Sequence, residues 1–243
     1  MISVIIPTLD AERELGATLT ALVPATLEGL VREVVIADGG SIDATLQIGD
    51  DAGARIVNCP RGRGPQLARG GAHAKGPWLL FLHADTRLDP GWSHEAEQFI
   101  NRVTNRKKAA GAFRFALDDT GIRPRLLETL VALRCRLFRL PYGDQGLLIE
   151  KGFYEELGGF AEFPLMEDVE FVRRIGGKRI QLLSSRAVTS AARYEDKGYL
   201  RRISRNLHCL CLYFAGVAPQ DIARRYDPAT SEKPAGESSD ARS

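Results

Sequence analysis

The sequence predicts an α/β fold with a mostly parallel central sheet and helices on both faces. Three observations lead to this fold class. Short, β-branched runs that stop at a polar residue or at proline are typical of buried parallel strands. Helical patterns of about 10–15 residues separate these runs, as in successive βαβ units. Polar, glycine-containing turns follow several of the runs, where doubly wound sheets bind their ligands.

The first half of the chain alternates between strand and helix patterns. Strands are expected at Ser3–Ile6, Val34–Ala37, Arg55–Asn58 and Trp78–Leu82. Helices are expected at about residues 11–22, 42–52 and 65–75, with a fourth after Asp89 and Pro90. The strand runs are almost continuously apolar, which indicates a parallel sheet that is covered on both faces.

The regular alternation ends in the second half of the chain. A strand is expected at about residues 111–117, a long helix at about 124–140 and a polar loop at Tyr142–Gly146. A short strand, a helix opening near Glu167, strand-like pieces near Ile180 and Val188, and a final helix at about 199–216 follow. Residues 1–226 are therefore expected to form one domain. Residues 227–243 contain almost nothing apolar, so we expect a disordered tail there.

The composition narrows the class of protein. The 243 residues are 44% hydrophobic and 26% charged, which excludes a chain that is disordered throughout. The 33 Lys and Arg nearly balance the 31 Asp and Glu, so no electrostatic argument favours a nucleic-acid partner. Four scattered cysteines argue against a disulfide scaffold and a zinc site. We expect no signal peptide, no membrane span and a cytoplasmic location, because the chain begins with a strand-like run and lacks any apolar stretch of about 20 residues.

Asp38 directly follows a buried strand and precedes two glycines. A carboxylate at this position could accept the N3–H of a uracil, while the glycines would let a ligand approach the backbone. The same residues also suit a plain turn, in which Asp38 caps backbone N–H groups and Ser41 begins the next helix. Both interpretations stay open from this segment alone.

His83 and Asp85 follow another buried strand and are two residues apart, so they could face the same side. A carboxylate at a strand end suits Mg²⁺ or Mn²⁺ that bridges a diphosphate. His83 is a poor ligand for Mg²⁺ and a better one for Mn²⁺. Alternatively, Asp85 caps the next helix and His83 is a packing or hydrogen-bonding residue.

Two further segments carry charged side chains at expected helix starts. Arg61–Gln66 is basic and glycine-rich, which suits a phosphate, although the segment lacks the P-loop spacing. Leu165–Phe171 places three acids in a first helical turn, where one carboxylate could act as general base toward an acceptor hydroxyl. A solvated turn and a favourable helix dipole explain the two segments equally well.

The helix at about residues 125–140 combines many leucines with four arginines. Such a helix suits the interface near lipid headgroups, and an ordinary core helix with a solvated face fits the same pattern. The Tyr142–Gly146 loop could shape an acceptor pocket, although its spacing specifies no reaction. An apolar helix pattern near the C-terminus indicates core positions rather than metal ligands for His208, Cys209 and Cys211.

Four blocks occur in order along the chain: Ser3–Asp10, Val35–Ser41, Phe81–Thr86 and Met166–Glu170. Together they resemble the family-2 glycosyltransferases, over about residues 2–226. The resemblance implies a GT-A fold, with a Rossmann-like, mostly parallel central sheet and helices on both faces. The blocks Pro141–Gly146 and Pro164–Asp168 are similar to a short bacterial subgroup labelled as arsenosugar-type glycosyltransferases.

The resemblance also implies roles for individual residues. Asp168 would be the catalytic base with Glu167 beside it. On the acceptor side we expect Asp144 and Gln145, because they lie in the polar Tyr142–Gly146 loop. Asp85 would reach a divalent metal, Mn²⁺ or Mg²⁺, with His83 as a second candidate ligand. The residues that would bind the nucleotide-sugar are Pro7, Thr8, Asp10, Asp38, Arg63, Asp85 and Arg193.

The chain departs from the family pattern at three places. Asp10 stands where Asn is usual, and the Glu that often follows it is absent or displaced to Glu12. His83 replaces the first Asp of the Asp-x-Asp motif, which weakens metal binding or favours Mn²⁺. The Gln-x-x-Arg-Trp motif of processive synthases is missing from the region of Ala192–Tyr194, so a polymerase is not expected.

The resemblance therefore implies an inverting, non-processive, metal-assisted transfer of a sugar from a UDP-sugar to a small-molecule or lipid-linked acceptor. Peripheral contact with the inner face of a membrane and a homodimer are further expectations. A nucleotidyltransferase on a related sheet is an alternative, but residues 8–13 lack the glycine-rich basic loop that it needs. A nucleotide-binding protein without catalysis is another; His83 favours it, and the Glu167–Asp168 pair argues against it.

Overall fold

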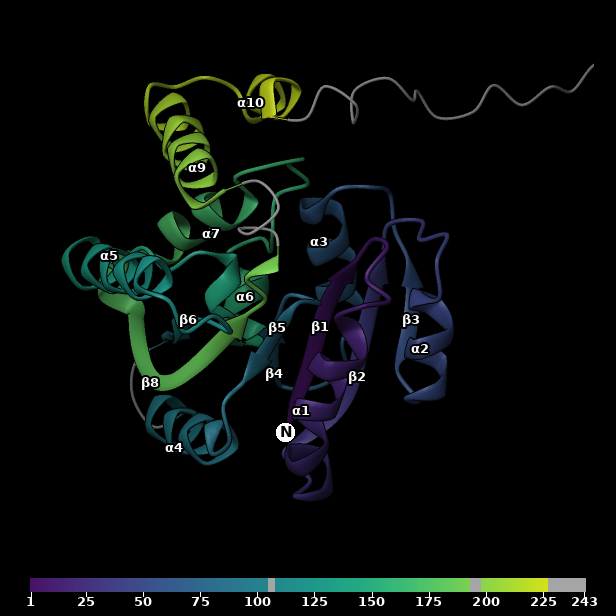
Figure 1. Ribbon diagram of the computed structural model, residues 1–243. Helices are drawn as coiled ribbons and strands as arrows, with labels where there is room; N and C mark the ends of the chain where they lie inside the picture. Colours follow the sequence, from purple (N-terminus) through teal and green to yellow (C-terminus); the bar gives the residue numbers. More distant parts are fainter. Residues whose placement is uncertain (105–107, 193–197, 227–243) are drawn as a thin grey trace, which may run out of the picture.

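The computed structural model describes residues 1–104, 108–192 and 198–226. Within them the strands form one curled sheet in the order β3-β2-β1-β4-β7-β6-β8-β5 (Figure 1). The strands are β1 (Ile2–Thr8), β2 (Val31–Asp38), β3 (Arg55–Asn58), β4 (Trp78–Phe81), β5 (Thr86–Leu88), β6 (Ala110–Leu117), β7 (Leu147–Glu150) and β8 (Ile180–Thr189). The expected fold class, an α/β structure with a mostly parallel sheet, is confirmed.

β1 lies inside the parallel half of the sheet. It pairs in parallel with β2 on one side and β4 on the other, and β2 pairs in parallel with β3. Val4, Ile5 and Ile6 are fully buried, as expected for a β-branched run that is covered on both faces. The register places Thr8 opposite Asp38, so the carboxyl ends of β1 and β2 meet at one edge of the sheet.

The other half of the sheet contains antiparallel pairs and a bend. β7 runs antiparallel between β4 and β6, and β5 runs antiparallel to β8. The two pieces expected near Ile180 and Val188 form one strand, β8, whose register against β6 shifts between Leu182 and Arg186. In this bulge the backbone N–H groups of Ser184 and Ser185 donate to the Glu95 carboxylate at 2.6 and 2.7 Å. Glu95 thus satisfies donors that the ladder leaves unpaired, and the bulge bends the strand.

Helices cover both faces of the sheet. α1 (Leu15–Leu27) and α4 (Trp92–Thr104) share a core cluster with Val4 and Ile6. α3 (Arg63–His73), α6 (Lys151–Glu156) and α7 (Glu167–Ile175) share a second cluster with Ile5. The two clusters lie on opposite faces because successive side chains of a strand point in opposite directions. α2 (Thr45–Asp51) packs against α1 and β3.

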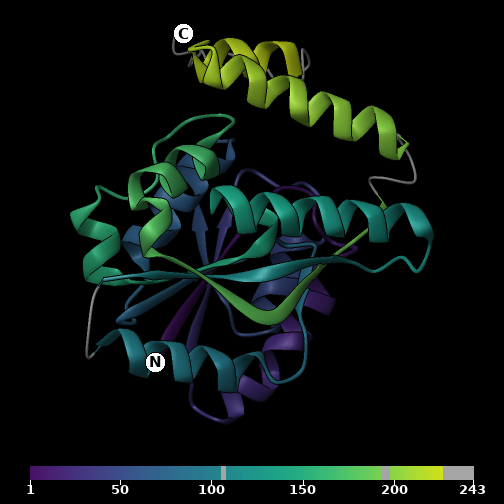
Figure 2. The same ribbon diagram turned by 90° about the vertical axis from the view of Figure 1, so that its left-hand side faces the viewer.

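Three more helices lie on one side of this body. α5 (Ile122–Phe138) packs on β6, and α9 (Tyr199–Phe214) packs with α10 (Pro219–Tyr226) against the start of α7. Figure 2 shows α9 above α5 on the same side of the sheet. Among the helices that the structure describes, none combines the length and the apolar character needed to cross a membrane.

Several boundaries differ from the expected ones. α1 begins at Leu15 rather than near Ala11, because Asp10 has a positive φ of 49° and residues 12–14 form a turn, in which the N–H of Glu14 donates to the carbonyl of Ala11 at 3.2 Å. The sequence pattern did not indicate β5, α6 or α10, each of which has eight residues or fewer. Arg193 and the expected tail at 227–243 lie outside the described residues.

Candidate active site

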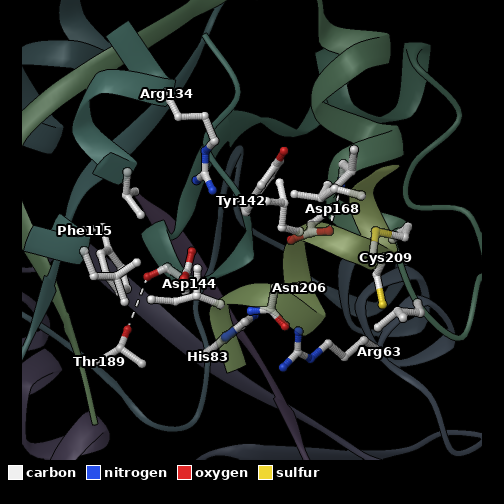
Figure 3. A pocket seen from close by; sticks show the side chains of 18 of the residues that line it. Arg63, His83, Phe115, Arg134, Tyr142, Asp144, Asp168, Thr189, Asn206 and Cys209 are labelled. Atoms are coloured by element: carbon white, nitrogen blue, oxygen red, sulfur yellow. Dashed lines mark hydrogen bonds between the residues drawn. The ribbon is translucent and has the colours of Figure 1, made fainter. Parts of the chain in front are cut away.

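A cavity of about 390 Å³ lies beyond the carboxyl end of β4 (Figure 3). Its polar wall comes from the start of α3, the loop after β4, the loop before β7, the start of α7 and the end of β8. The fold thus brings together side chains that are far apart in the sequence. The sequence-predicted residues that line the cavity are Arg63, His83, Asp85, Asp144, Glu167 and Asp168.

Asp168 is held in place by two backbone N–H groups. Gly143 donates to its Oδ2 at 2.8 Å, and Val169 donates to its Oδ1 at 2.7 Å. A β-carbon on Gly143 would lie 2.8 Å from Nε2 of His83 and 3.3 Å from Oδ2 of Asp168. A larger residue at position 143 would therefore have to displace the imidazole, and glycine lets the backbone lie close to both side chains.

Glu167 occupies a different environment from its neighbour. The residue before it, Met166, is the N-cap of α7 and has a left-handed φ of 66°, which is uncommon for a non-glycine residue. Glu167 is 2% exposed, and this burial raises its pKa to about 8, with the charge of Asp168 adding to the rise and Arg63 opposing it. At neutral pH Glu167 therefore retains its proton.

Asp144 is a second buried acid at the cavity. Burial raises its pKa; the nearby charge of Arg134 opposes the rise, and that of Asp168 adds to it. Its Oδ1 atom is buried and has no hydrogen-bond partner in the part of the chain that the structure describes. Buried polar atoms are normally satisfied, so this oxygen is a candidate for contact with a bound hydroxyl group.

Arg134 and Tyr142 line the cavity. Tyr142 belongs to the loop that was expected to shape an acceptor pocket, whereas Arg134 was expected only as an arginine of the helix at about residues 125–140. The guanidinium of Arg134 lies 3.8 Å from the centre of the Tyr142 ring and donates to Oε1 of Gln145 at 3.3 Å. Gln145, expected on the acceptor side, does not line the cavity; it is buried and donates to the carbonyl of Phe113 at 2.9 Å. Gln145 thus fastens the loop to β6, while Arg134 and Tyr142 form the wall.

Most of the rest of the cavity wall is built by α5 and α9. Asn206 contributes a polar side chain from α9. No motif in the sequence indicates that α5 and α9 lie beside Asp85, Asp144 and Asp168. The amphipathic pattern of α9 predicts that one face of the helix is buried, but it does not show which part of the protein that face packs against.

The expected nucleotide-binding residues Pro7, Thr8, Asp10 and Asp38 gather at the ends of β1 and β2 and do not line this cavity. Asp38 is buried and accepts hydrogen bonds from Thr8 Oγ1, Gly40 N, Ser41 N and Ser41 Oγ, at 2.5 to 2.9 Å. Burial raises the pKa of Asp38, but these hydrogen bonds outweigh it and hold the pKa below its usual value. Asp38 therefore shapes this turn.

Two other side chains support the same edge of the sheet. Oδ1 of Asp10 accepts the N–H of Ile42 at 2.9 Å and so joins the loop after β1 to the loop after β2. Gln66 is buried, and its Nε2 donates to the carbonyls of Thr8 and Ala37 at 2.5 and 2.9 Å. The edge is therefore pre-organised by side chains from both loops and from α3.

The donor set of the cavity fits one mode of metal binding. Among the described residues no group of three or more His, Cys, Asp and Glu side chains is placed to hold a metal ion by itself. Asp85 and His83 nevertheless line the cavity together. Divalent ions in nucleotide sites are often held by one or two carboxylates together with substrate phosphates, and the residues present fit this mode.

Comparison with known proteins identifies the family. Residues 3–151 match the model of glycosyl transferase family 2, more than half of the 243 residues. The chain belongs to this family.

This family-2 chain is 37% identical over 101 residues to a PGL/p-HBAD biosynthesis glycosyltransferase of Mycobacterium bovis, covering 36% of each protein. It is 33% identical over 93 residues to a glucosyl-3-phosphoglycerate synthase of Mycolicibacterium paratuberculosis, covering 35% of this chain and 28% of that protein. The chain thus spans about a third of the length of the curated relatives it matches.

Solved structures agree on the fold. The family-2 chain is similar to S. aureus TarS 1-349 in complex with UDP, with a TM-score of 0.60 and 20% identity over 78% of this chain and 61% of that one. It is also similar to glucosyl-3-phosphoglycerate synthase from Mycobacterium tuberculosis in complex with Mn²⁺, UDP and glucosyl-3-phosphoglycerate. For that structure the TM-score is 0.54 and the identity 21%, over 78% of this chain and 70% of the other. The expected GT-A fold is confirmed.

Proposed function

We propose that this protein transfers one sugar from a UDP-sugar to a hydroxyl group of an acceptor, with inversion at the anomeric carbon. The observation that carries the proposal is the meeting of Asp85, Arg63 and Asp168 at one cavity beyond a parallel strand. Membership of the family and the UDP-bound structural neighbours support the choice of donor. The sequence lacks the Gln-x-x-Arg-Trp motif of processive synthases, which supports a non-processive reaction.

Asp168 is the proposed base. Its two hydrogen bonds from backbone N–H groups orient the carboxylate at the cavity wall, as positioned proton transfer requires. Glu167 retains its proton at neutral pH, so it does not act as the base there. In a direct displacement with inversion, Asp168 takes the proton of the acceptor hydroxyl while the oxygen attacks the sugar from the side opposite the UDP.

Arg63 and Asp85 belong to the leaving-group side in this proposal. Arg63 at the start of α3 contacts the diphosphate, whose charge suits a guanidinium and a helix N-terminus. Asp85, with His83 as the second ligand, holds Mn²⁺ or Mg²⁺. A divalent ion, when bound, stabilises the negative charge that develops on the departing diphosphate.

The turn at Asp38–Ser41 is the proposed uracil site, with Pro7, Thr8 and Asp10 beside it. Asp38 already accepts four hydrogen bonds from the protein. An N3–H group would therefore share an oxygen that is already used, and the pre-organised turn would supply the shape of the site.

Peripheral membrane contact through α5, a homodimer and a cytoplasmic location stay predictions. The described cysteines are free thiols, which is compatible with a reducing compartment. Sedimentation with anionic liposomes at low and high salt tests the membrane contact. Binding at low salt that weakens at high salt supports it, and no binding at low salt contradicts it.

A nucleotide panel tests the proposed function. UDP with Mn²⁺ should raise the melting temperature more than GDP or ADP with Mn²⁺, and UDP-sugars should release UDP when an acceptor is present. Equal shifts with all three nucleotides would remove the uracil assignment. Release of pyrophosphate from UTP and a sugar phosphate would indicate a nucleotidyltransferase instead.

A further inference from the structure

α5 exposes an unusually apolar face. Five of its large hydrophobic side chains recur at spacings of three or four residues, which places them along one side of the helix, and Phe138 directly follows the last of them. Each of them is at least half exposed, whereas most large apolar side chains of the sheet and of α1 are buried. We call this set the α5 stripe: Ile122, Leu126, Leu130, Leu133, Leu137 and Phe138.

The α5 stripe is continuous with the cavity. Leu130 is 50% exposed and also lines the cavity, and Leu207 on α9 is 59% exposed and lines it too. Further in, these helices line the cavity with the apolar side chains of Leu127, Val131 and Ile203, beside the polar side chains of Arg134 and Asn206. The cavity therefore has an apolar mouth between α5 and α9, formed by Leu130 and Leu207.

The two ends of this cavity differ in chemistry. The inner end carries the carboxyl groups of Asp144 and Asp168, both of which line the cavity (Figure 3). A small, fully polar acceptor would satisfy the inner end and would leave the apolar mouth in contact with water. An acceptor with an apolar part removes both the inner apolar wall and the mouth from water.

We infer that the acceptor is an amphiphile. Its hydroxyl-bearing head lies at Asp168, and its hydrocarbon chain or ring leaves the cavity between Leu130 and Leu207. The inference rests on the proposed function, because it gives the acceptor class of the same site. It names no head group, since the polar end requires only a hydroxyl near the carboxylates.

Alkyl β-glucosides serve as the probe, with methyl, hexyl and octyl chains, each below its micelle-forming concentration. Calorimetric titration of the full chain measures affinity and stoichiometry. Affinity should rise by about two- to fourfold for each methylene group that becomes buried, with one molecule bound per chain. An affinity that does not depend on chain length would overturn the inference.

Leu130→Gln and Leu133→Gln form a matched pair. Both leucines lie on α5 and are exposed to the same extent, 50% and 51%, but only Leu130 lines the cavity. Leu130→Gln should weaken octyl glucoside binding about five- to tenfold, while Leu133→Gln should leave it unchanged. Equal weakening in both variants would mean that the chain adsorbs on the helix surface, and the inference would be wrong.

UDP binding, measured on the same preparations, separates this inference from the proposed function. If UDP binds and the glucoside affinities do not rise with chain length, the acceptor class is wrong and the transferase proposal stands. If UDP does not bind, but glucoside affinity rises with chain length and Leu130→Gln weakens it, the cavity binds amphiphiles and the transferase proposal is wrong.

Discussion

Replacing Glu167 by Gln tests the burial of a carboxyl group beside the proposed base. The side chain is 2% exposed, and its pKa in the folded protein is about 8 against an ordinary value of 4.5. Because the folded state holds the proton more tightly, the stabilising effect of that proton is fully present below pH 4.5. It is lost progressively as the pH rises to about 8, since the unfolded chain ionises first. Gln at this position does not titrate.

The size of the effect follows from the two pKa values. At 1.36 kcal/mol for each pH unit, the wild-type chain loses roughly 3 kcal/mol relative to Glu167→Gln between pH 4.5 and pH 7. The loss reaches about 5 kcal/mol above pH 8. For a chain of this length, about 3 kcal/mol corresponds to a shift of roughly 6–12 °C, in favour of the variant, in the difference between the two melting temperatures from pH 4.5 to pH 7.

Thermal unfolding of both proteins from pH 4.5 to pH 9 measures the effect. The difference between variant and wild type removes the contribution of every group that titrates equally in both. We expect the variant to gain stability over the wild type with rising pH and the gain to level off above pH 8. A difference that stays constant over this range would show that Glu167 is ionised in the folded protein, and it would reopen the choice of base.

Two further substitutions test the geometry of the site and of the sheet edge. Gly143→Ala should reduce turnover at least about tenfold and should affect the melting temperature less. The added β-carbon would displace the His83 imidazole and the Asp168 carboxylate. Unchanged turnover would contradict this arrangement. Gln66→Leu should destabilise the protein by about 1–3 kcal/mol in urea unfolding, because Nε2 no longer satisfies two buried carbonyls, and no destabilisation would contradict that role.

The parallel half of the fold was predictable from local sequence. β1, β4 and the second half of β2 are buried on both faces, so these stretches are largely apolar in the sequence and can be recognised as strands. β8 was predicted as two pieces because its burial does not alternate regularly. β8 continues through its bulge because Glu95, on α4, accepts hydrogen bonds from the backbone there. A contact between residues so far apart in the chain cannot be predicted from the local sequence.

The candidate site was predictable where it lies at strand ends. Asp85 and Asp38 follow strands that run in parallel, so their common edge followed from the βαβ pattern. The different environments of Glu167 and Asp168 were not predictable, because burial depends on the left-handed turn at Met166 and on the packing of α7. The apolar wall was missed because α5 and α9 meet the cavity only through tertiary packing.

The most direct test of the proposed mechanism compares Asp168→Asn with Asp85→Ala. UDP affinity with Mn²⁺ is measured by calorimetry, and UDP release is measured from UDP-glucose and UDP-N-acetylglucosamine with an octyl glucoside acceptor. Asp168→Asn should bind UDP as the wild type does while UDP release falls about 10²–10⁴-fold, the scale of general-base catalysis. Asp85→Ala should lose UDP affinity as well, and EDTA should reproduce its effect in the wild type. Near-normal UDP release by Asp168→Asn would contradict the assignment of Asp168 as the base.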